Sequence, residues 1–143
     1  MKIAISNIAW DRREDEAVAQ LMQQFGVTGL DVAPGKLGPD PLALSDADIQ
    51  TYVDFWQSYS VQIVGMQSLL YGHPELTLFQ DEATRTKTSE YLKRVIRLAA
   101  KLGAKPLVFG SPKNRQRGTM ALDVAMDIAA EFFHDLAQYA HLH

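Results

Sequence analysis

The stretch YLKRVIRLAAKLGAKPLVFG, residues 91–110, places an amphipathic helix, a glycine and a short apolar run in direct succession. Apolar residues recur at helical spacing on one face: Tyr91, Leu92, Val95, Ile96, Ala99 and Leu102. Such a stripe predicts a helix packed against a core. Gly103 follows at the position where helices commonly end in a left-handed residue. Residues 106–110 then predict a short buried strand, so the stretch joins one helix to one strand.

The same alternation extends along the rest of the chain. Short apolar runs predict strands near residues 2–6, 29–33, 61–66 and 106–110. Helical spacing predicts a helix after each strand: residues 15–25, a helix that begins behind the capping residue Ser45, the helix that ends at Leu102, and a last helix from about residue 123. The chain therefore repeats a strand–helix unit.

Alternation of strands and helices implies a parallel sheet with helices packed outside it. Right-handed crossovers place every helix on one face when the strands keep sequential order, and the strand spacing matches the βα unit of a barrel. We therefore predict one α/β domain over residues 1–143: the first four βα units of a TIM-type (β/α) barrel, a half barrel with parallel strands in order 1-2-3-4. A doubly wound sheet is the alternative, but the turn at residues 6–10 lacks the glycines of a phosphate-binding turn.

The composition is that of an ordinary globular protein, with 47% hydrophobic and 22% charged residues. A net charge of −3 provides no basic footprint for nucleic acid or an anionic membrane. The sequence has no cysteine, which excludes disulfides and thiolate metal sites. The stretch after Lys2 is too short and polar for a signal peptide, and no run approaches the roughly 18 apolar residues of a membrane helix. We expect a cytoplasmic protein without nucleic-acid or membrane partners.

Four segments at the strand ends resemble those of a known family. They are SNIAW at residues 6–10, GLDVAP at 29–34, VGMQSLLYG at 64–72 and LVFGSPKNR at 107–115. In order, and over essentially the whole chain, they resemble the sugar isomerase/epimerase superfamily, the xylose-isomerase-like, AP-endonuclease-type TIM barrels. The resemblance implies isomerisation or epimerisation of a sugar or sugar phosphate, assisted by a divalent metal (Mn²⁺, Mg²⁺, Zn²⁺ or Co²⁺).

The resemblance also implies that the metal ligands come from strands five to eight, which this sequence does not contain. We therefore expect an N-terminal half, a fragment or truncated member of the family, that carries the substrate-side loops, lacks the metal site and is inactive alone. No catalytic, cofactor-binding or metal-binding residue is assigned. Two alternatives stay open: a metal-dependent hydrolase or nuclease of the same superfamily, which the net charge disfavours, and a non-catalytic half barrel that acts by self-association.

Polar and aromatic residues that follow the first and third strands are candidates for a sugar pocket: Asn7, Trp10, Gln67 and Ser68. Trp10 would offer an apolar face to a sugar ring. The alternative for Trp10 is packing against the first helix.

The loop after the fourth strand supplies candidates for anion binding. Ser111, Lys113 and Arg115 combine a hydroxyl with two cations, a set that suits phosphate. In a barrel this loop lies on the active face. The alternative is an ordinary solvated loop.

The remaining titratable residues receive weaker assignments. Asp31 faces opposite to its apolar neighbours in the strand, and either points inward near the pocket or makes a structural hydrogen bond. His73 is interpreted as a solvated loop histidine, because no second ligand lies at metal-site spacing. His134 and His141 are expected to form a surface pair, since a zinc site needs three or four ligands.

A half barrel leaves two sheet edges with unpaired backbone groups and an open inner face. Apolar residues from strands expected to be buried on both sides are Ile3, Ile5, Val61, Ile63, Leu107 and Phe109. Whichever alternate set faces inward would form a larger apolar patch than monomers usually expose. We therefore expect a homodimer or higher oligomer with the inner face in the interface.

Overall fold

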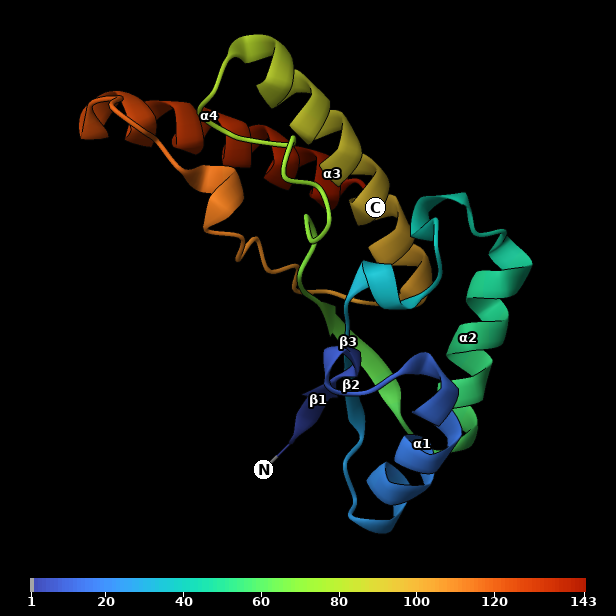
Figure 1. Cartoon of the computed structure of the whole chain (residues 1–143). Helices are drawn as coiled ribbons and strands as arrows, with labels where there is room; N and C mark the ends of the chain where they lie inside the picture. Colours follow the sequence, from blue (N-terminus) through green and yellow to red (C-terminus); the bar gives the residue numbers. More distant parts are fainter. Residues whose placement is uncertain (1) are drawn as a thin grey trace.

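A computed structural model describes residues 2–143 as a parallel sheet with four α-helices around it (Figure 1). The elements in chain order are β1 (Ala4–Ser6), α1 (Asp15–Gln24), β2 (Gly29–Val32), α2 (Asp46–Ser58), β3 (Gln62–Met66), α3 (Glu82–Leu102) and α4 (Leu122–His141). Short 3₁₀ turns lie at Asn7–Ala9, Arg12–Glu14, Pro34–Lys36, Pro41–Ala43 and Lys113–Arg115. Within this described part, no helix is long and apolar enough to span a membrane.

The sheet has three strands in the order β1-β2-β3, all parallel. Leu30 of β2 lies opposite Ile5 on one side and Ile63 on the other. The next pair joins Asp31 to Gly65, so β3 bulges at Val64. The predicted α/β class is confirmed, and these three strands keep the predicted sequential parallel order.

The predicted fourth strand at residues 106–110 is wrong in its extent. It is reduced to one parallel bridge between Met66 and Leu107, held by two backbone hydrogen bonds of 2.9 Å each. Proline cannot donate to a ladder, so Pro106 limits pairing at the start. On the far side of this segment, no strand of residues 2–143 is available as a second neighbour. The sequential order is therefore confirmed for β1-β2-β3, while the predicted order 1-2-3-4 over four strands is not confirmed.

The core fills the space between the sheet and the helices. Leu30, Val32 and Met66 on the strands are fully buried, as is Trp56 of α2. Helices α1 and α2 lie on the same side of the sheet (Figure 1). The common helical side that right-handed crossovers predict is therefore present for these two units.

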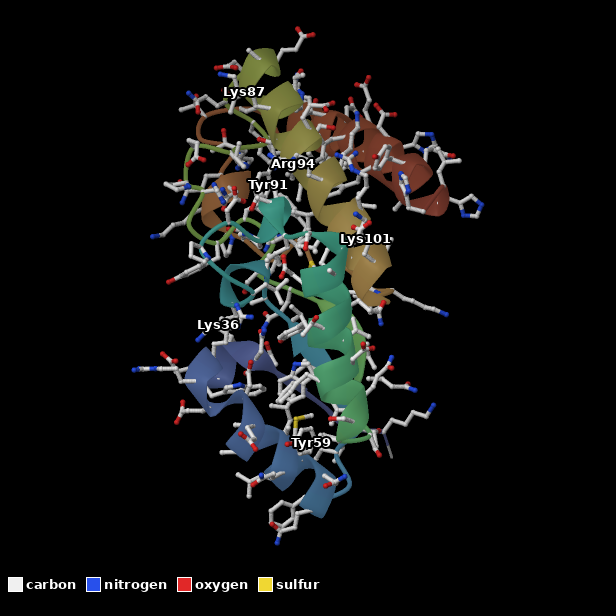
Figure 2. The ribbon with its side chains drawn as sticks, turned by 90° about the vertical axis from the view of Figure 1, so that its right-hand side faces the viewer. Lys36, Tyr59, Lys87, Tyr91, Arg94 and Lys101 are labelled. Carbon is white, nitrogen blue, oxygen red and sulfur yellow. The ribbon has the colours of Figure 1, made fainter. Side chains whose placement is uncertain are left out.

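Helix α3 is amphipathic, as the apolar stripe along residues 91–102 predicts. Asp81 caps its first turn with a side-chain hydrogen bond, and Gly103 ends it with a φ of 79°. The apolar face of residues 91–102 packs into the core. The other side is basic, and Figure 2 shows Arg94 and Lys101 along it. The two faces thus separate as their spacing predicts.

The sheet face turned away from α1 and α2 is open among the described residues (Figure 1). Its apolar side chains are Val64 and Val108, which are 39% and 53% exposed. Of the residues expected on a doubly buried sheet, four lie instead on the helical side, buried or half-buried against the core: Val61, Ile63, Leu107 and Phe109. Ile3 and Ile5 are exposed at the free edge of the sheet.

Candidate functional site

Polar side chains from all three strand ends meet at the carboxyl edge of the sheet. Gln67, directly after β3, donates from Nε2 to Oγ of Ser6 at the end of β1, 2.5 Å away. Ser68 donates from Oγ to Oε1 of Gln67 at 3.3 Å. Asp31 of β2 is the register neighbour of Ser6. We call Ser6, Asp31, Gln67 and Ser68 the edge cluster.

Asp31 places a carboxylate in this cluster on the open side of the sheet. Burial raises the pKa of its carboxyl, with no opposing hydrogen bond or cation. The carboxylate has room because residue 65 is glycine: a Cβ at Gly65 would lie 3.0 Å from Oδ1 of Asp31. A half-buried carboxylate without its own donor suits a hydroxyl donor from outside the chain.

Ser68 holds an unusual backbone conformation beside the cluster. Its φ is 56°, in the left-handed region that serine rarely adopts. The backbone N–H of the adjacent Gln67 donates to the Val32 carbonyl at 2.9 Å. Backbone strain of this kind concentrates at sites that must hold a side chain in one direction. Ser60, in the turn before β3, has a similar φ of 62°, so the conformation fixes the direction of Ser68 without marking a site by itself.

Asn7 lies next to the cluster but is engaged within the chain. It is 2% exposed. Its Oδ1 accepts from the Ala33 amide at 2.8 Å, and its Nδ2 donates to the Tyr52 hydroxyl at 3.5 Å. The side chain therefore ties the end of β1 to the end of β2 and to α2.

Trp10 lies on the helical side of the sheet and packs at the start of the first helix, which is the alternative to a role in a sugar pocket. Its ring contacts that of Trp56 with centroids 6.1 Å apart, and its Nε1 donates to Oδ1 of Asp15 at 2.7 Å. Asp15 is the first residue of α1. Trp10 therefore anchors the first helix, and its carbonyl accepts from Lys36 at 2.6 Å.

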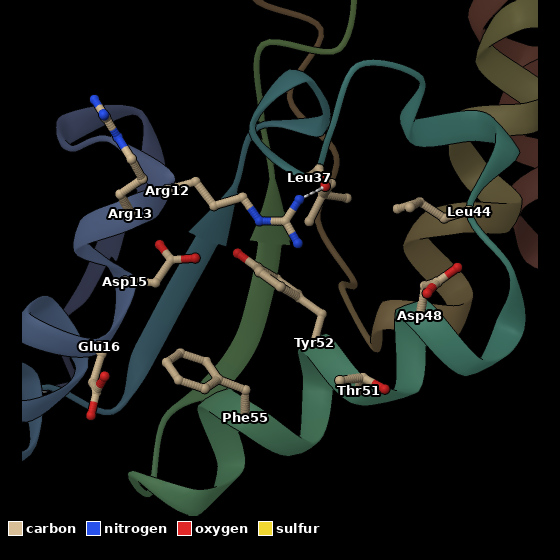
Figure 3. Close-up of a pocket in the computed structure, with 10 residues that line it drawn as sticks. All are labelled: Arg12, Arg13, Asp15, Glu16, Leu37, Leu44, Asp48, Thr51, Tyr52 and Phe55. Carbon is tan, nitrogen blue, oxygen red and sulfur yellow. Dashed lines mark hydrogen bonds between the residues drawn. The ribbon is translucent and has the colours of Figure 1, made fainter.

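A cavity of about 440 Å³ opens between α1 and α2 (Figure 3). The Arg12 guanidinium reaches across it and donates to the Leu37 carbonyl, while Tyr52 points toward Arg12 and Asp15. Burial raises the pKa of the Asp15 carboxyl, opposed mainly by the hydrogen bond from Trp10. The cavity lies on the helical side and is lined by none of the seven candidate residues, so it is separate from the edge cluster.

The predicted anion loop forms a 3₁₀ turn with its two cations outside. Lys113 and Arg115 are both exposed, and Ser111 is half-buried. The Ser111 hydroxyl donates to Oδ1 of Asn114. The loop thus presents two cations on a fixed backbone, while its serine is engaged internally.

Asn114 is the residue in this loop that the sequence interpretation missed. It is 2% exposed, and its Nδ2 donates to the carbonyls of His73 and Leu76, each at 2.7 Å. The backbone carbonyl of Asn114 accepts from the backbone N–H of Leu78 at 2.8 Å. Asn114 therefore clamps the loop after β3 to the loop before α4. A single asparagine in a polar loop gives no sequence signal for this role.

The histidines do not assemble a metal site. Across residues 2–143, no three histidine, aspartate or glutamate side chains converge as metal ligands would. His73 lies in a loop, where its Nδ1 is 3.1 Å from Oε1 of Glu75. Its ring packs on that of Tyr91, with centroids 4.6 Å apart. The residues present therefore do not fit a catalytic divalent metal, and no step through such a metal can be derived from them.

No protein-family model matches the sequence, and no curated protein matches it significantly. Solved structures do match. The chain resembles D-psicose 3-epimerase, crystallised in the presence of D-fructose, with 15% identity and a TM-score of 0.70. It also resembles a putative xylose isomerase from Rhodospirillum rubrum, with 15% identity and a TM-score of 0.70. A sugar phosphate isomerase/epimerase from Parabacteroides distasonis matches with 14% identity and a TM-score of 0.67.

Each match covers 99% of this chain but only 49% to 50% of the other. The chain thus spans about half the length of the structures it resembles. At these identities the likeness shows the fold: the chain has the α/β fold of half of these TIM-barrel proteins. The resemblance drawn from the four strand-end segments is therefore confirmed as a resemblance of fold.

Proposed function

We propose that this chain binds a small sugar or sugar phosphate at the carboxyl edge of its sheet, as the substrate side of a sugar isomerase or epimerase barrel. The observation that supports this best is the edge cluster, which gathers polar groups from three parallel strand ends on the open face. Barrel enzymes place their active sites at this edge. The similar solved structures bear the names of sugar epimerases and isomerases.

The cluster matches the chemistry of a sugar. The Gln67 amide and the hydroxyls of Ser6 and Ser68 can each donate and accept, as sugar hydroxyls do. Asp31 contributes an acceptor that orients one hydroxyl, with a charged hydrogen bond stronger than a neutral one. Asn7 and Trp10 serve this proposal indirectly, since their bonds hold the ends of β1 and β2 and the start of α1.

A phosphate group on the sugar would engage the loop after residue 110. In this proposal Lys113 and Arg115 supply the positive charge, and Ser111 exchanges its bond to Asn114 for one to a phosphate oxygen. Both cations are exposed, so each contact contributes modestly. The loop therefore tunes the preference for a phosphorylated over a free sugar.

Isomerisation or epimerisation by such barrels needs a divalent metal that polarises the substrate's oxygens. The part of the chain that the structure describes holds no ligand set for one. We propose that the metal, whether Mn²⁺, Mg²⁺, Zn²⁺ or Co²⁺, is held by residues outside this chain. This chain then binds and orients substrate and is inactive alone. A cytoplasmic location and the lack of nucleic-acid partners stay predictions.

The test is a titration of the ¹⁵N-labelled protein with D-fructose, D-psicose and a hexose phosphate, followed by amide chemical shifts. Saturable shifts at Ser6, Gln67 and Ser68 are expected. Gln67→Ala should abolish them. Gln62→Ala is the matched control, because Gln62 is an exposed glutamine at the opposite end of the same strand. The proposal fails if no sugar gives saturable shifts, or if the Gln67 variant binds as well as the Gln62 variant.

A further inference from the structure

We infer that two copies of this chain close a ring, with β1 of each copy beside residues 106–110 of its partner. Each copy would then supply the wall that faces the other copy's edge cluster. The statement about the cluster rests on the proposed function; the assembly itself rests on surface and topology alone.

The chain exposes more surface than a folded monomer of its mass. Its accessible surface is 8898 Å². A compact monomer of 16.0 kDa exposes about 7,400 Å². The excess of about 1,500 Å² per copy corresponds to about 3,000 Å² for a pair, within the range of obligate homodimers. The uncovered area is therefore of the size that a stable dimer buries.

Apolar side chains are exposed on the first and the last unit of the fold. On the first unit they are Ile3 and Ile5 at the free edge of β1, with Leu21 and Phe25 on and after α1; Phe25 is 73% exposed. We call these four residues the first apolar edge. Surface leucine and phenylalanine at one helical spacing normally pack against a neighbouring helix.

Helix α4 provides the second surface, because its apolar arc extends beyond the part that is buried against the core. One face, with Phe132 and Leu136, is buried against the core. The other places Leu122, Met126 and Phe133 at helical spacing, and Met126 is 62% exposed. The apolar arc of α4 is therefore wider than the stripe that the core covers, and its outer part is left exposed.

This second face of α4 adjoins the last strand position. The ring of Phe133 packs on that of Phe109 with centroids 5.1 Å apart. The neighbouring Val108 is 53% exposed. Because Val108 lies on the open face of the sheet, the name last apolar edge is given to the three α4 residues Leu122, Met126 and Phe133.

A second copy is the occupant that fits both edges at once. All strands are parallel and in sequential order. A two-fold axis along the strands therefore places the last edge of each copy beside the first edge of the other, which gives two identical contacts. Two copies would also equal the length of one similar solved structure, of which this chain matches 49% to 50%. Pairing would give residues 106–110 the second neighbour they lack and extend the single bridge into a strand.

Closure would complete the wall of the proposed sugar site. The described residues of neither copy supply a metal ligand set, so the ring would bind a sugar without isomerising it. Alone, the edge cluster has protein on one side and solvent on the other, where Val64 is 39% exposed. In the ring, the partner's cluster lies across the barrel at the same carboxyl edge. The water-excluded space between them strengthens each polar contact to a sugar.

The assembly is tested first by sedimentation velocity at micromolar concentration. We expect a dimer of about twice the chain mass of 16.0 kDa. Leu21→Glu and Met126→Glu each put a charge into one apolar edge and should weaken association by about tenfold or more. Gln20→Glu and Gln138→Glu are the matched controls, since they add the same charge at exposed polar positions of the same helices. A stable monomer, or equal weakening by the controls, would overturn the inference.

Cysteine cross-linking tests the arrangement, because the natural sequence has no cysteine. Ile5 shares the face of its register partner Leu30, and Leu107 lies on that same helical side. Under mild oxidation the double variant Ile5→Cys/Leu107→Cys should therefore form a covalent dimer, while either single variant should not. Efficient cross-linking of Ile5→Cys with itself would show that β1 lies beside β1 of the partner, and would refute the ring. A dimer with the expected cross-links that gives no sugar shifts would sink the proposed function and leave the assembly standing. A monomer that gives saturable sugar shifts would refute the assembly and leave the proposed function standing.

Discussion

A methyl group on Gly65 would lie 3.0 Å from Oδ1 of Asp31 and 3.3 Å from Cγ of Pro106. Gly65→Ala should therefore displace the carboxylate or the backbone of residue 106, at a cost of about 1–3 kcal/mol of unfolding free energy. Urea unfolding measures it. Gly35→Ala is the matched control, because a Cβ at Gly35 meets nothing within 4 Å. Equal stability of the two variants would mean that Gly65 does not shape the site.

Asp31→Asn should stabilise the fold at neutral pH and weaken sugar binding. Burial raises the pKa of Asp31, so the folded state holds the proton more tightly than the unfolded state. The charged form therefore destabilises the protein above that pKa, and the penalty disappears as the pH falls through it. The stability difference between variant and wild type should shrink on acidification, in urea unfolding at several pH values. A variant less stable at neutral pH would indicate an unrecognised partner of the carboxylate.

Asn114→Ala should destabilise the protein by about 1–3 kcal/mol, because it leaves the carbonyls of His73 and Leu76 without their donor. The neighbouring Arg115→Ala should stay within about 0.5 kcal/mol, since that side chain is exposed. Thermal unfolding of both variants makes the comparison. Similar losses in the two would show that the clamp contributes no stability.

Trp10→Phe keeps an aromatic ring against Trp56 but removes the 2.7 Å hydrogen bond to Asp15. Because that bond opposes the effect of burial, the pKa of Asp15 should rise further in the variant. The loss of stability should be about 1.5–3 kcal/mol at neutral pH, the value of a hydrogen bond to a charged group. It should fall as Asp15 becomes protonated in acid. A loss independent of pH would assign the effect to packing instead.

Periodicity predicted the helices because burial on one face imposes it. α1 and α4 begin within a residue of their expected starts, and Ser45 caps α2 as predicted, in a capping box that Asp48 completes. The strand at residues 106–110 could not be judged this way. Its apolar residues reflect burial against α4, while ladder formation depends on a neighbour that the local sequence does not specify.

The site was predictable only in part. Strand-end position predicted that Gln67 and Ser68 lie at the carboxyl edge, since parallel strands bring their carboxyl ends to one edge; whether they bind a sugar stays a prediction. Position at a strand end could not distinguish Trp10 from these residues. The ring of Trp10 lies on the helical side, where its Nε1 donates to Asp15. The space that Gly65 leaves for Asp31 depends on a bulge between two strands, and the role of Asn114 depends on loops far apart in sequence. Such relationships exist only in the folded chain.

The Asn114 clamp also sets an order of events during synthesis. Its amide binds carbonyls 41 and 38 residues earlier in the chain, with all of α3 in between. On the ribosome, the segment from His73 to Leu78 emerges long before the residue that secures it, so it must wait unsecured while α3 forms. The amide of Leu78, bonded to the Asn114 carbonyl, is then among the last to gain protection from hydrogen exchange. A ribosome paused before codon 114 would hold a chain whose first three strands have been synthesised and whose loop from His73 to Leu78 still lacks the donor that secures it.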